Sequence, residues 1–275
     1  MTSLKIFEAP KMPVWSATVL SVANVVYETN NYIDVPILAD AIEDMGYSDS
    51  NTQKMVNHCR HEGPHTKGCW VVATILGQPF VPQLDNWEQV YRELGMSREF
   101  YKDFSRLNMH CPCGQWAIPM IKGSCMTCNN IVPTLRKVGS QVWTFENNLD
   151  GNISQNDRNP ANGSYVVSFR AVLEADEENK NQSANQRREQ GCKDVTLLER
   201  LLLELAYFLT TDKHLDVNRC TACIGSRLFL GGFVPFVGYL AIDHEVNVCC
   251  YDLNYCHDFM RARSVISFSP IQNSG

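Results

Sequence analysis

The sequence predicts an α+β protein with a small helical N-terminal module, a cysteine-containing segment, and a C-terminal domain of strands around one long helix. Residues 37–45 (ILADAIEDM) and 196–209 (TLLERLLLELAYFL) repeat apolar side chains at the spacing of an amphipathic helix. Residues 165–173 (YVVSFRAVL) and 246–251 (VNVCCY) alternate as strands do, and 261–267 (RARSVIS) is typical of a closing strand. We therefore expect a helical module over 1–105, a cysteine-containing segment over 106–146 and a mixed domain over 147–275.

Composition and charge exclude several classes of function. The chain of 275 residues has a formal net charge of −6 and no basic stripe, so we expect no nucleic-acid partner. No apolar run has the ~18 residues of a membrane span. The first residues lack the apolar region of a secretory signal, which favours a cytoplasmic location. No catalytic triad, paired-carboxylate motif or phosphate loop is present, so we expect no enzymatic activity.

The N-terminal module contains the first predicted helix and several weaker elements. Gly46 follows the helix over 37–45 as a C-cap, and 52–59 is expected to form a second short helix. Residues 87–104 favour helix with a break near Gly95, and Ser97 is a candidate N-cap for the helix after that break.

Two cysteines and three histidines lie within residues 58–69 (HCRHEGPHTKGC). His61 and His65 have the spacing of a helical metal-ligand pair, but Gly63 and Pro64 between them disfavour a helix there. We therefore interpret the segment as a turn that returns the chain to the first helices. Metal binding by Cys59, His65 and Cys69 is left open.

The twelve cysteines include two close pairs with metal-ligand spacing. Four thiolates arranged in two such pairs suit a tetrahedral Zn²⁺ ion, and the residues between the pairs alternate as the hairpin of a zinc ribbon does. The first pair is C-x-C, where a ribbon usually has C-x-x-C, so His110 is an alternative ligand. A second zinc site at the C-x-x-C of Cys220 and Cys223 lacks a partner pair at ribbon spacing. The sequence thus predicts one cofactor, a structural zinc ion, and its predicted ligands are Cys111, Cys113, Cys125 and Cys128.

The C-terminal domain is expected to begin after the Asn- and Gly-rich segment 147–163, which is typical of an exposed loop or boundary. Residues 176–191 are strongly polar and are predicted to be a solvated loop or frayed helix. In the long helix, Thr196 and Glu199 form a capping-box pattern. Its leucines define the buried stripe, whereas its charged residues are expected to face water: Glu199, Arg200 and Glu204.

The last part of the chain, from Gly225 to Phe268, contains two sets of residues. One set forms a regular frame that reads GSR, GG, VP-V, V-V and RARSVIS. The residues between the frame positions are a loose mixture of Cys, Tyr, Phe, Leu, Asn, Asp and His. Such a mixture is unusual for a single evolved core. The alternative is an ordinary hydrophobic pair of C-terminal strands.

The closing segment FMRARSVIS resembles the last strand of C-type-lectin-fold domains. The whole frame resembles the variable end of target proteins of diversity-generating retroelements. In that family a template is copied with errors at adenines, and randomised Asn codons cannot then yield Lys, Glu, Gln, Met or Trp. Between Leu228 and Phe259 only Glu245 belongs to this excluded set. The resemblance covers about the last hundred residues, and its motifs are short.

This resemblance implies a hypervariable domain of C-type-lectin-like fold that recognises a protein or surface ligand without catalysis. The frame would fold the domain, and the residues between would face outward. Two alternatives remain: an enzyme of the formylglycine-generating type on the same fold, and a zinc-ribbon adaptor with a purely structural C-terminal domain. About half of the candidate ligand-binding residues are core residues if the variable-face interpretation fails. The candidates are Leu228, Phe229, Leu230, Phe233, Phe236, Tyr239, Cys249, Tyr251, Tyr255, His257 and Phe259.

Overall fold

The computed structural model describes residues 14–29, 31–61, 65, 69–77, 84, 87–96, 115–229 and 231–268. The chain divides into two compact units, Met1–Phe80 and Val81–Gly275. This division differs from the boundaries expected at 105 and 146, because strands and helices on both sides of residue 146 share one core.

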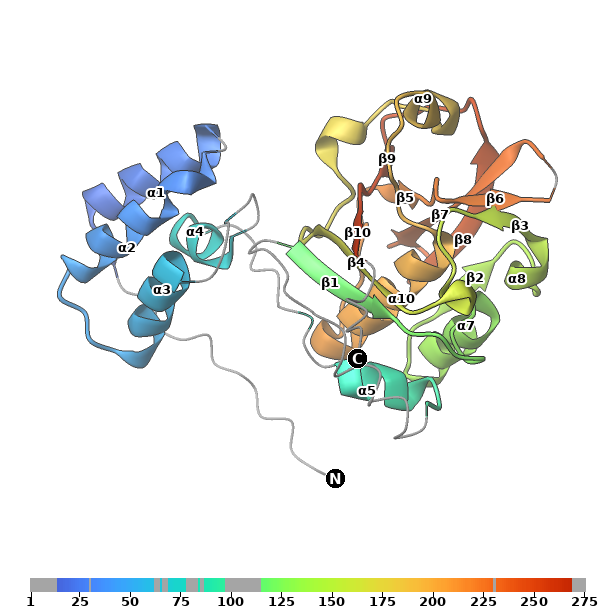
Figure 1. Ribbon diagram of the computed structural model, residues 1–275, viewed down its shortest axis with the longest axis horizontal. Helices are drawn as coiled ribbons and strands as arrows, with labels where there is room; N and C mark the ends of the chain where they lie inside the picture. Colours follow the sequence, from blue (N-terminus) through green and yellow to red (C-terminus); the bar gives the residue numbers. More distant parts are fainter. Residues whose placement is uncertain are drawn as a thin grey trace, which may run out of the picture. The chain divides into compact units, whose positions relative to one another are not determined.

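The first unit is helical (Figure 1). Helix α2 packs against α1 and α3, and α1 also contacts α4. The helix predicted at 37–45 lies at Val35–Glu43 with a proline in its first turn, and Gly46 follows it with a φ of +72°. The elements are α1 (Ala17–Thr29), η1 (Tyr32–Asp34), α2 (Val35–Glu43), α3 (Ser50–His61) and α4 (Trp70–Ile75).

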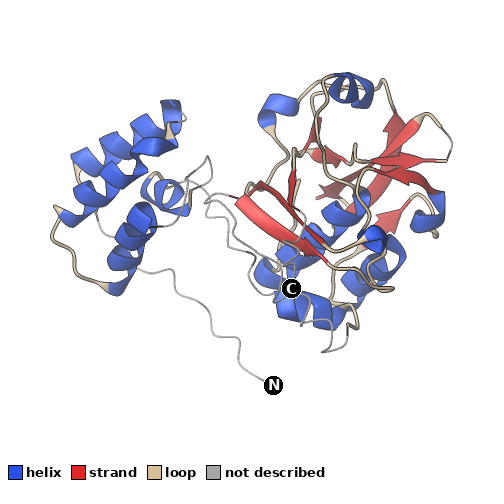
Figure 2. Ribbon diagram, in the orientation of Figure 1, coloured by secondary structure: helices blue, strands red, loops and turns tan. Residues whose placement is uncertain are grey.

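The second unit is α+β, as the sequence predicts, and contains sheets of three, five and two strands among its described residues (Figure 2). Its helical elements are α5 (Trp87–Glu93), α7 (Cys128–Lys137), α8 (Leu149–Asn152), η2 (Pro160–Asn162), η3 (Glu177–Asn179), α9 (Ala184–Glu189) and α10 (Leu197–Thr211). Its strands are β1 (Gln115–Met120), β2 (Val142–Thr144), β3 (Ile153–Asn156), β4 (Tyr165–Arg170), β5 (Cys220–Ala222), β6 (Ser226–Leu228), β7 (Phe233–Leu240), β8 (Glu245–Asp252), β9 (Met260–Ala262) and β10 (Ile266–Phe268).

The three-stranded sheet has the antiparallel order β1-β4-β10, so the strand predicted at 165–173 lies between β1 and the closing strand β10. The predicted closing strand is divided into β9 and β10. Strand β1 comes from the segment expected to form a zinc-ribbon hairpin. It pairs with β4 instead, because its apolar side chains are buried in the core of this unit. The five-stranded sheet has the order β2-β8-β7-β5-β9, and β3 pairs with β6.

The segments expected to be exposed loops are integrated into the unit. Residues 147–163 contribute α8 and β3, and the carboxylate of Asp150 accepts hydrogen bonds from the first amides of α7. Residues 176–191 contribute α9, whose Arg187 is buried and forms an ion pair of 2.7 Å with Asp194. Both expectations hold only in part: many side chains of these segments are exposed, but Asp150 and Arg187 hydrogen-bond to residues of other segments, Asn129 and Ser264 among them.

Helix α10 contacts α5, α7, β1 and β7. Its capping box is confirmed: the Thr196 hydroxyl accepts from the Glu199 amide, and the Glu199 carboxylate accepts from the Thr196 amide. The expectation that its charged residues face water is wrong, because Glu199, Arg200 and Glu204 are all fully buried. A helix covered on all sides belongs to the interior of a unit, and its charges therefore need ionic partners.

Those partners come from distant positions. Arg158 and Tyr165 donate hydrogen bonds to Glu199, and Arg200 pairs with Glu204 at 2.8 Å and with Asp216 at 2.9 Å. Asp216 also accepts from Arg263 at 2.7 Å. Burial alone would raise the pKa of Asp216, but the two guanidinium groups hold it below its ordinary value. This buried network joins α10 to the closing strands.

Candidate ligand-binding face

Strands β7 and β8 separate their side chains onto two faces of the five-stranded sheet. Val237 lies opposite Val248, and both are fully buried in the main core with α10. Phe236 lies opposite Cys249, and Val234 opposite Tyr251, on the other face. That second face has a smaller cluster of buried residues from β5, β7 and β9, against which partly buried side chains from β8 and its following loop pack.

Five rings gather on this second face, and we call them the C-terminal aromatic cluster. They belong to Phe236, Tyr251, Tyr255, His257 and Phe259. Tyr251 is at the centre: its ring centroid lies 4.3 Å from that of Phe236 and 4.6 Å from that of Tyr255, both stacked.

Exposure increases from the strand to the loop. Phe236 is only 8% exposed because it lies beneath Tyr251, whereas Tyr255 is 37% exposed and His257 is exposed. The ring centroids of His257 and Phe259 are 4.5 Å apart. The loop after β8 therefore presents aromatic side chains to solvent on a firm apolar base.

The frame residues lie mainly in the interior. Ser226 and Arg263 are at most 1% exposed, and Arg227 and Arg261 are each 8% exposed. Gly225 is required sterically, because a Cβ atom there would lie 2.7 Å from the carbonyl oxygen of Asp194. Gly231, in the turn before β7, has a φ of +68°, which favours glycine. Most frame positions are thus fixed by packing or backbone geometry.

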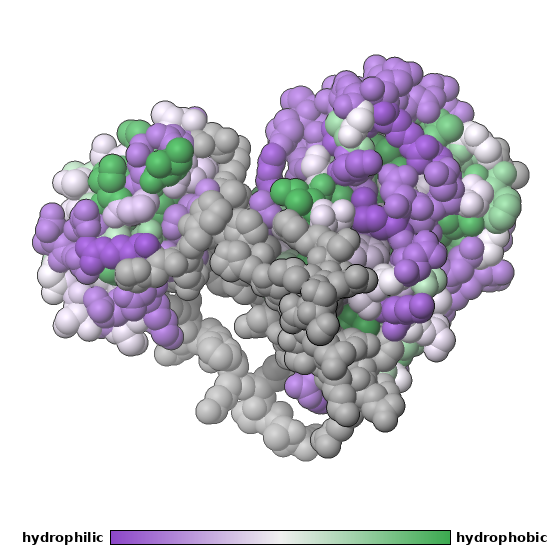
Figure 3. Space-filling model, viewed as in Figure 1, coloured by the Kyte–Doolittle hydropathy of each residue, from purple (hydrophilic) through white to green (hydrophobic). Residues whose placement is uncertain are grey.

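Not every candidate ligand-binding residue lies on this face. Leu228 is 3% exposed and is a core residue, because β6 pairs with β3. Phe233 and Tyr239 have the opposite parity on β7 from Phe236, and Tyr239 stacks on His214 at 4.2 Å. Phe229 is 68% exposed but follows β6 rather than β8. Leu230 lies outside the described residues. In the view of Figure 3 the surface of this unit is mostly hydrophilic with small hydrophobic patches, one of them over the β3–β6 end.

The predicted zinc ligands are only partly described. Cys111 and Cys113 lie outside the described residues, Cys125 is half-buried, and Cys128 is fully buried at the start of α7. Burial raises the pKa of the Cys128 thiol well above its ordinary value, and the Asp150 carboxylate raises it further. An apolar environment of this kind disfavours the thiolate that zinc requires. Cys220 and Cys223 point to different clusters of buried residues, so they do not form a ligand pair.

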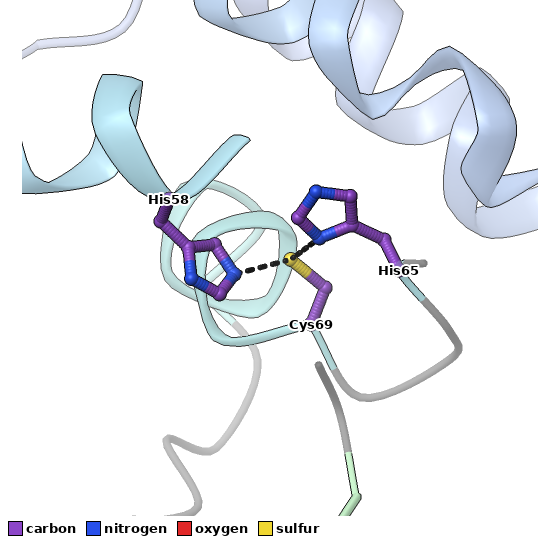
Figure 4. A group of neighbouring side chains, drawn as sticks. All are labelled: His58, His65 and Cys69. Carbon is purple, nitrogen blue, oxygen red and sulfur yellow. Dashed lines mark hydrogen bonds between the residues drawn. The ribbon is translucent and has the colours of Figure 1, made fainter. Parts of the chain in front are cut away.

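A different group of metal-ligating side chains is found in the first unit (Figure 4). Among the residues that the structure describes, His58, His65 and Cys69 are the group that could hold a metal ion, with one ligand atom of each lying within 4.8 Å of the others. The sequence interpretation favoured a turn and left metal binding by Cys59, His65 and Cys69 open; the structure brings together His65 and Cys69 with His58 in place of Cys59. The density of histidines in residues 58–69 was the feature of the sequence that pointed to a metal site. That His58 of α3, rather than another of these residues, joins the group depends on the tertiary structure.

Comparisons of this chain with protein-family models, curated proteins and solved structures found no match. Within the described part of the chain, no helix has the length and apolar character needed to cross a bilayer.

Proposed function

We propose that this protein is a ligand-binding protein whose recognition surface is formed by Tyr251, Tyr255, His257 and Phe259 of the C-terminal aromatic cluster, with Phe236 as the buried residue beneath them. We also propose that it is a target protein of a diversity-generating retroelement. The observation in favour is the segregation by burial within residues 225–268. Frame residues such as Ser226, Arg227 and Arg263 are buried, whereas most of the intervening positions on β8 and its loop reach the surface. A fixed backbone with changeable outward side chains is the arrangement that diversification requires.

The composition of the face suits recognition of a protein or of another surface ligand. Aromatic side chains provide large contact areas and are enriched among the residues that dominate binding energy. Tyr255 and His257 also offer polar atoms at the exposed end of the cluster. A C-type-lectin-like fold is part of this proposal, supported by the pairing of β4 with β10 and by the helix that covers the sheet.

The genetic test is the sequence of the neighbouring DNA. We expect a reverse-transcriptase gene and a near-copy of the segment that encodes Leu228–Phe259, with differences confined to adenines of the template copy. Sister copies of the gene should differ at the codons for Tyr251, Tyr255 and His257 and agree at the codon for Arg263. Sister copies that are invariant across the whole segment would contradict the proposal.

A test on the protein uses a library displayed on phage in which positions 249, 251, 255 and 257 are randomised. Most members should remain folded, and selection against unrelated protein baits should yield specific binders. A matched library randomised at Ser226, Arg227, Arg261 and Arg263 should lose folded protein. Equal loss in both libraries would contradict the division into frame and variable positions.

The formylglycine-generating alternative needs a reactive thiol. Burial raises the pKa of the thiols of Cys220, Cys223 and Cys250, which is the opposite of the shift that activates a cysteine nucleophile. These raised pKa values support recognition over this chemistry for the three residues. The structural zinc ion at Cys111, Cys113, Cys125 and Cys128, and the adaptor role that depends on it, stays a prediction. The test is elemental analysis of Cys111→Ser, which should hold about one zinc ion per chain fewer than the natural protein.

A further inference from the structure

We propose that His58, His65 and Cys69 bind a structural zinc ion that joins helices α3 and α4 of the first unit. This inference is independent of the proposed recognition function. The three residues come from separate elements: His58 from the last turns of α3, Cys69 from the position before α4, and His65 from between them. Figure 4 shows both imidazole rings directed at the Cys69 sulfur.

The distances fit a tetrahedral ion. His58 Nε2 lies 3.6 Å from Cys69 Sγ, and His65 Nδ1 lies 3.9 Å from it. With Zn–N bonds of about 2.0 Å and Zn–S bonds of about 2.3 Å, a tetrahedral site places nitrogen and sulfur ligands about 3.5 Å apart. The side chains are therefore close to the separation that a shared zinc ion requires.

The tautomer of His65 is also suitable. Its Nε2 atom lies 3.2 Å from the carbonyl oxygen of Cys59. A carbonyl only accepts hydrogen bonds, so Nε2 must hold the proton and Nδ1 keeps its lone pair toward the Cys69 sulfur. Metal-binding histidines generally donate their other N–H to such an acceptor, which fixes the orientation of the ring.

The chemistry of the set favours zinc. Two imidazoles and one thiolate are ligands of intermediate softness, which Zn²⁺ prefers and which Ca²⁺ and Mg²⁺ do not. His58 is 4% exposed and Cys69 is fully buried, so bulk water is largely kept from the ligands. Three protein ligands leave a fourth position for water or another donor.

The position of the site indicates a structural role. Helix α4 has six residues, and a helix so short gains little stability by itself. An ion bound to the residue before it and to α3 would hold the two helices together. Small units with limited cores commonly gain stability from a metal in this way.

The test uses the full chain in a Cys111→Ser background, which removes the separately predicted cysteine site. We expect about one zinc ion per chain by elemental analysis. Replacement with Co²⁺ should give the visible absorption of a tetrahedral site together with thiolate-to-cobalt charge transfer. Cys69→Ser should abolish the charge-transfer band, and His65→Ala should weaken Co²⁺ binding at least tenfold.

The matched controls are the exposed residues Cys256 and His244, where Cys256→Ser and His244→Ala should leave the metal content and the spectrum unchanged. If Cys69→Ser fails to fold, the proposal is still tested by the cobalt spectrum of the background protein and by Co²⁺ binding to His65→Ala, because His65 is only half-buried. The proposal is overturned if the background protein binds no Zn²⁺ or Co²⁺. It is equally overturned if the bound cobalt shows no thiolate band or if Cys69→Ser and His65→Ala both retain the metal unchanged.

Discussion

Arg263 connects the closing strands to the middle of the second unit. It donates to the Thr221 hydroxyl, to the carbonyl oxygens of Val172 and Leu173, and to the Asp216 carboxylate. Its side chain is 1% exposed in an ion pair with Asp216, which is fully buried. The residue predicted as part of a frame is thus fixed by more contacts than its spacing in the sequence could show.

Arg263→Ala should lower the free energy of unfolding by about 3–5 kcal/mol, because it leaves the buried Asp216 with only part of its compensating charge. Urea denaturation of the full chain measures this change. The control is Arg92→Ala, which breaks an exposed ion pair with Glu88 and should change stability only slightly. Similar losses in the two variants would show that the buried network contributes little.

Asp216 also gives an expectation for pH dependence. The pKa of Asp216 is lowered from 3.8 in the folded protein. Its ion pairs therefore stabilise the fold fully at pH values above 3.8, and this stabilisation is lost as the pH falls through the lower pKa of the folded state. Unfolding free energy should therefore decline more steeply with acid below about pH 4 in the natural protein than in Asp216→Asn. Denaturation curves measured across that range provide the comparison, and identical slopes would contradict the assignment.

At the scale of elements, α10 organises the second unit. Its start is set locally by the capping box of Thr196 and Glu199, and its leucines contact elements on several sides. Its hydrophobic stripe is predictable from the sequence. The burial of its charged side cannot be predicted from the sequence, because the charges that compensate Glu199 and Arg200 belong to the distant residues Arg158 and Asp216.

Thr196→Ala should cost about 1 kcal/mol of stability, since the amide of Glu199 then loses its hydrogen-bond acceptor at a helix start. Thermal unfolding monitored by circular dichroism measures the effect. Thr210→Ala is the control: its hydroxyl donates to the Ala206 carbonyl near the helix end, where that oxygen already has a backbone partner. An unchanged melting temperature in Thr196→Ala would show that tertiary packing alone fixes the start of α10.

At the scale of the whole molecule, the chain divides into two compact units. The sequence predicts a domain over residues 147–275, but β1, α7 and β2 precede that range and supply Trp116, Ile118, Ile131 and Val142 to the core of the second unit. The compact unit is therefore Val81–Gly275.

A chain of residues 81–275 should fold with a cooperative thermal transition and dispersed NMR amide signals, whereas a chain of residues 147–275 should not. The shorter chain would expose the apolar side chains of β4 and α10 that β1 and α7 cover. Cooperative unfolding of both chains would restore the boundary at 147. Failure of the longer chain would show that the first unit is needed.

The sequence by itself determined the features that depend on residues close together in the chain. These are the α+β class, the start of α10 and the strand character of β4 and β8. It also distinguished many of the frame residues that are buried. Such features depend on side-chain periodicity and on caps within one turn. Only the tertiary structure decided that Glu199, Arg200 and Glu204 are buried, that Leu228 and Tyr239 leave the candidate face, that β1 joins β4, and that His58 meets His65 and Cys69. These outcomes depend on partners far away in the sequence, because a buried charge or a shared metal ligand is stabilised only by groups that folding brings to it.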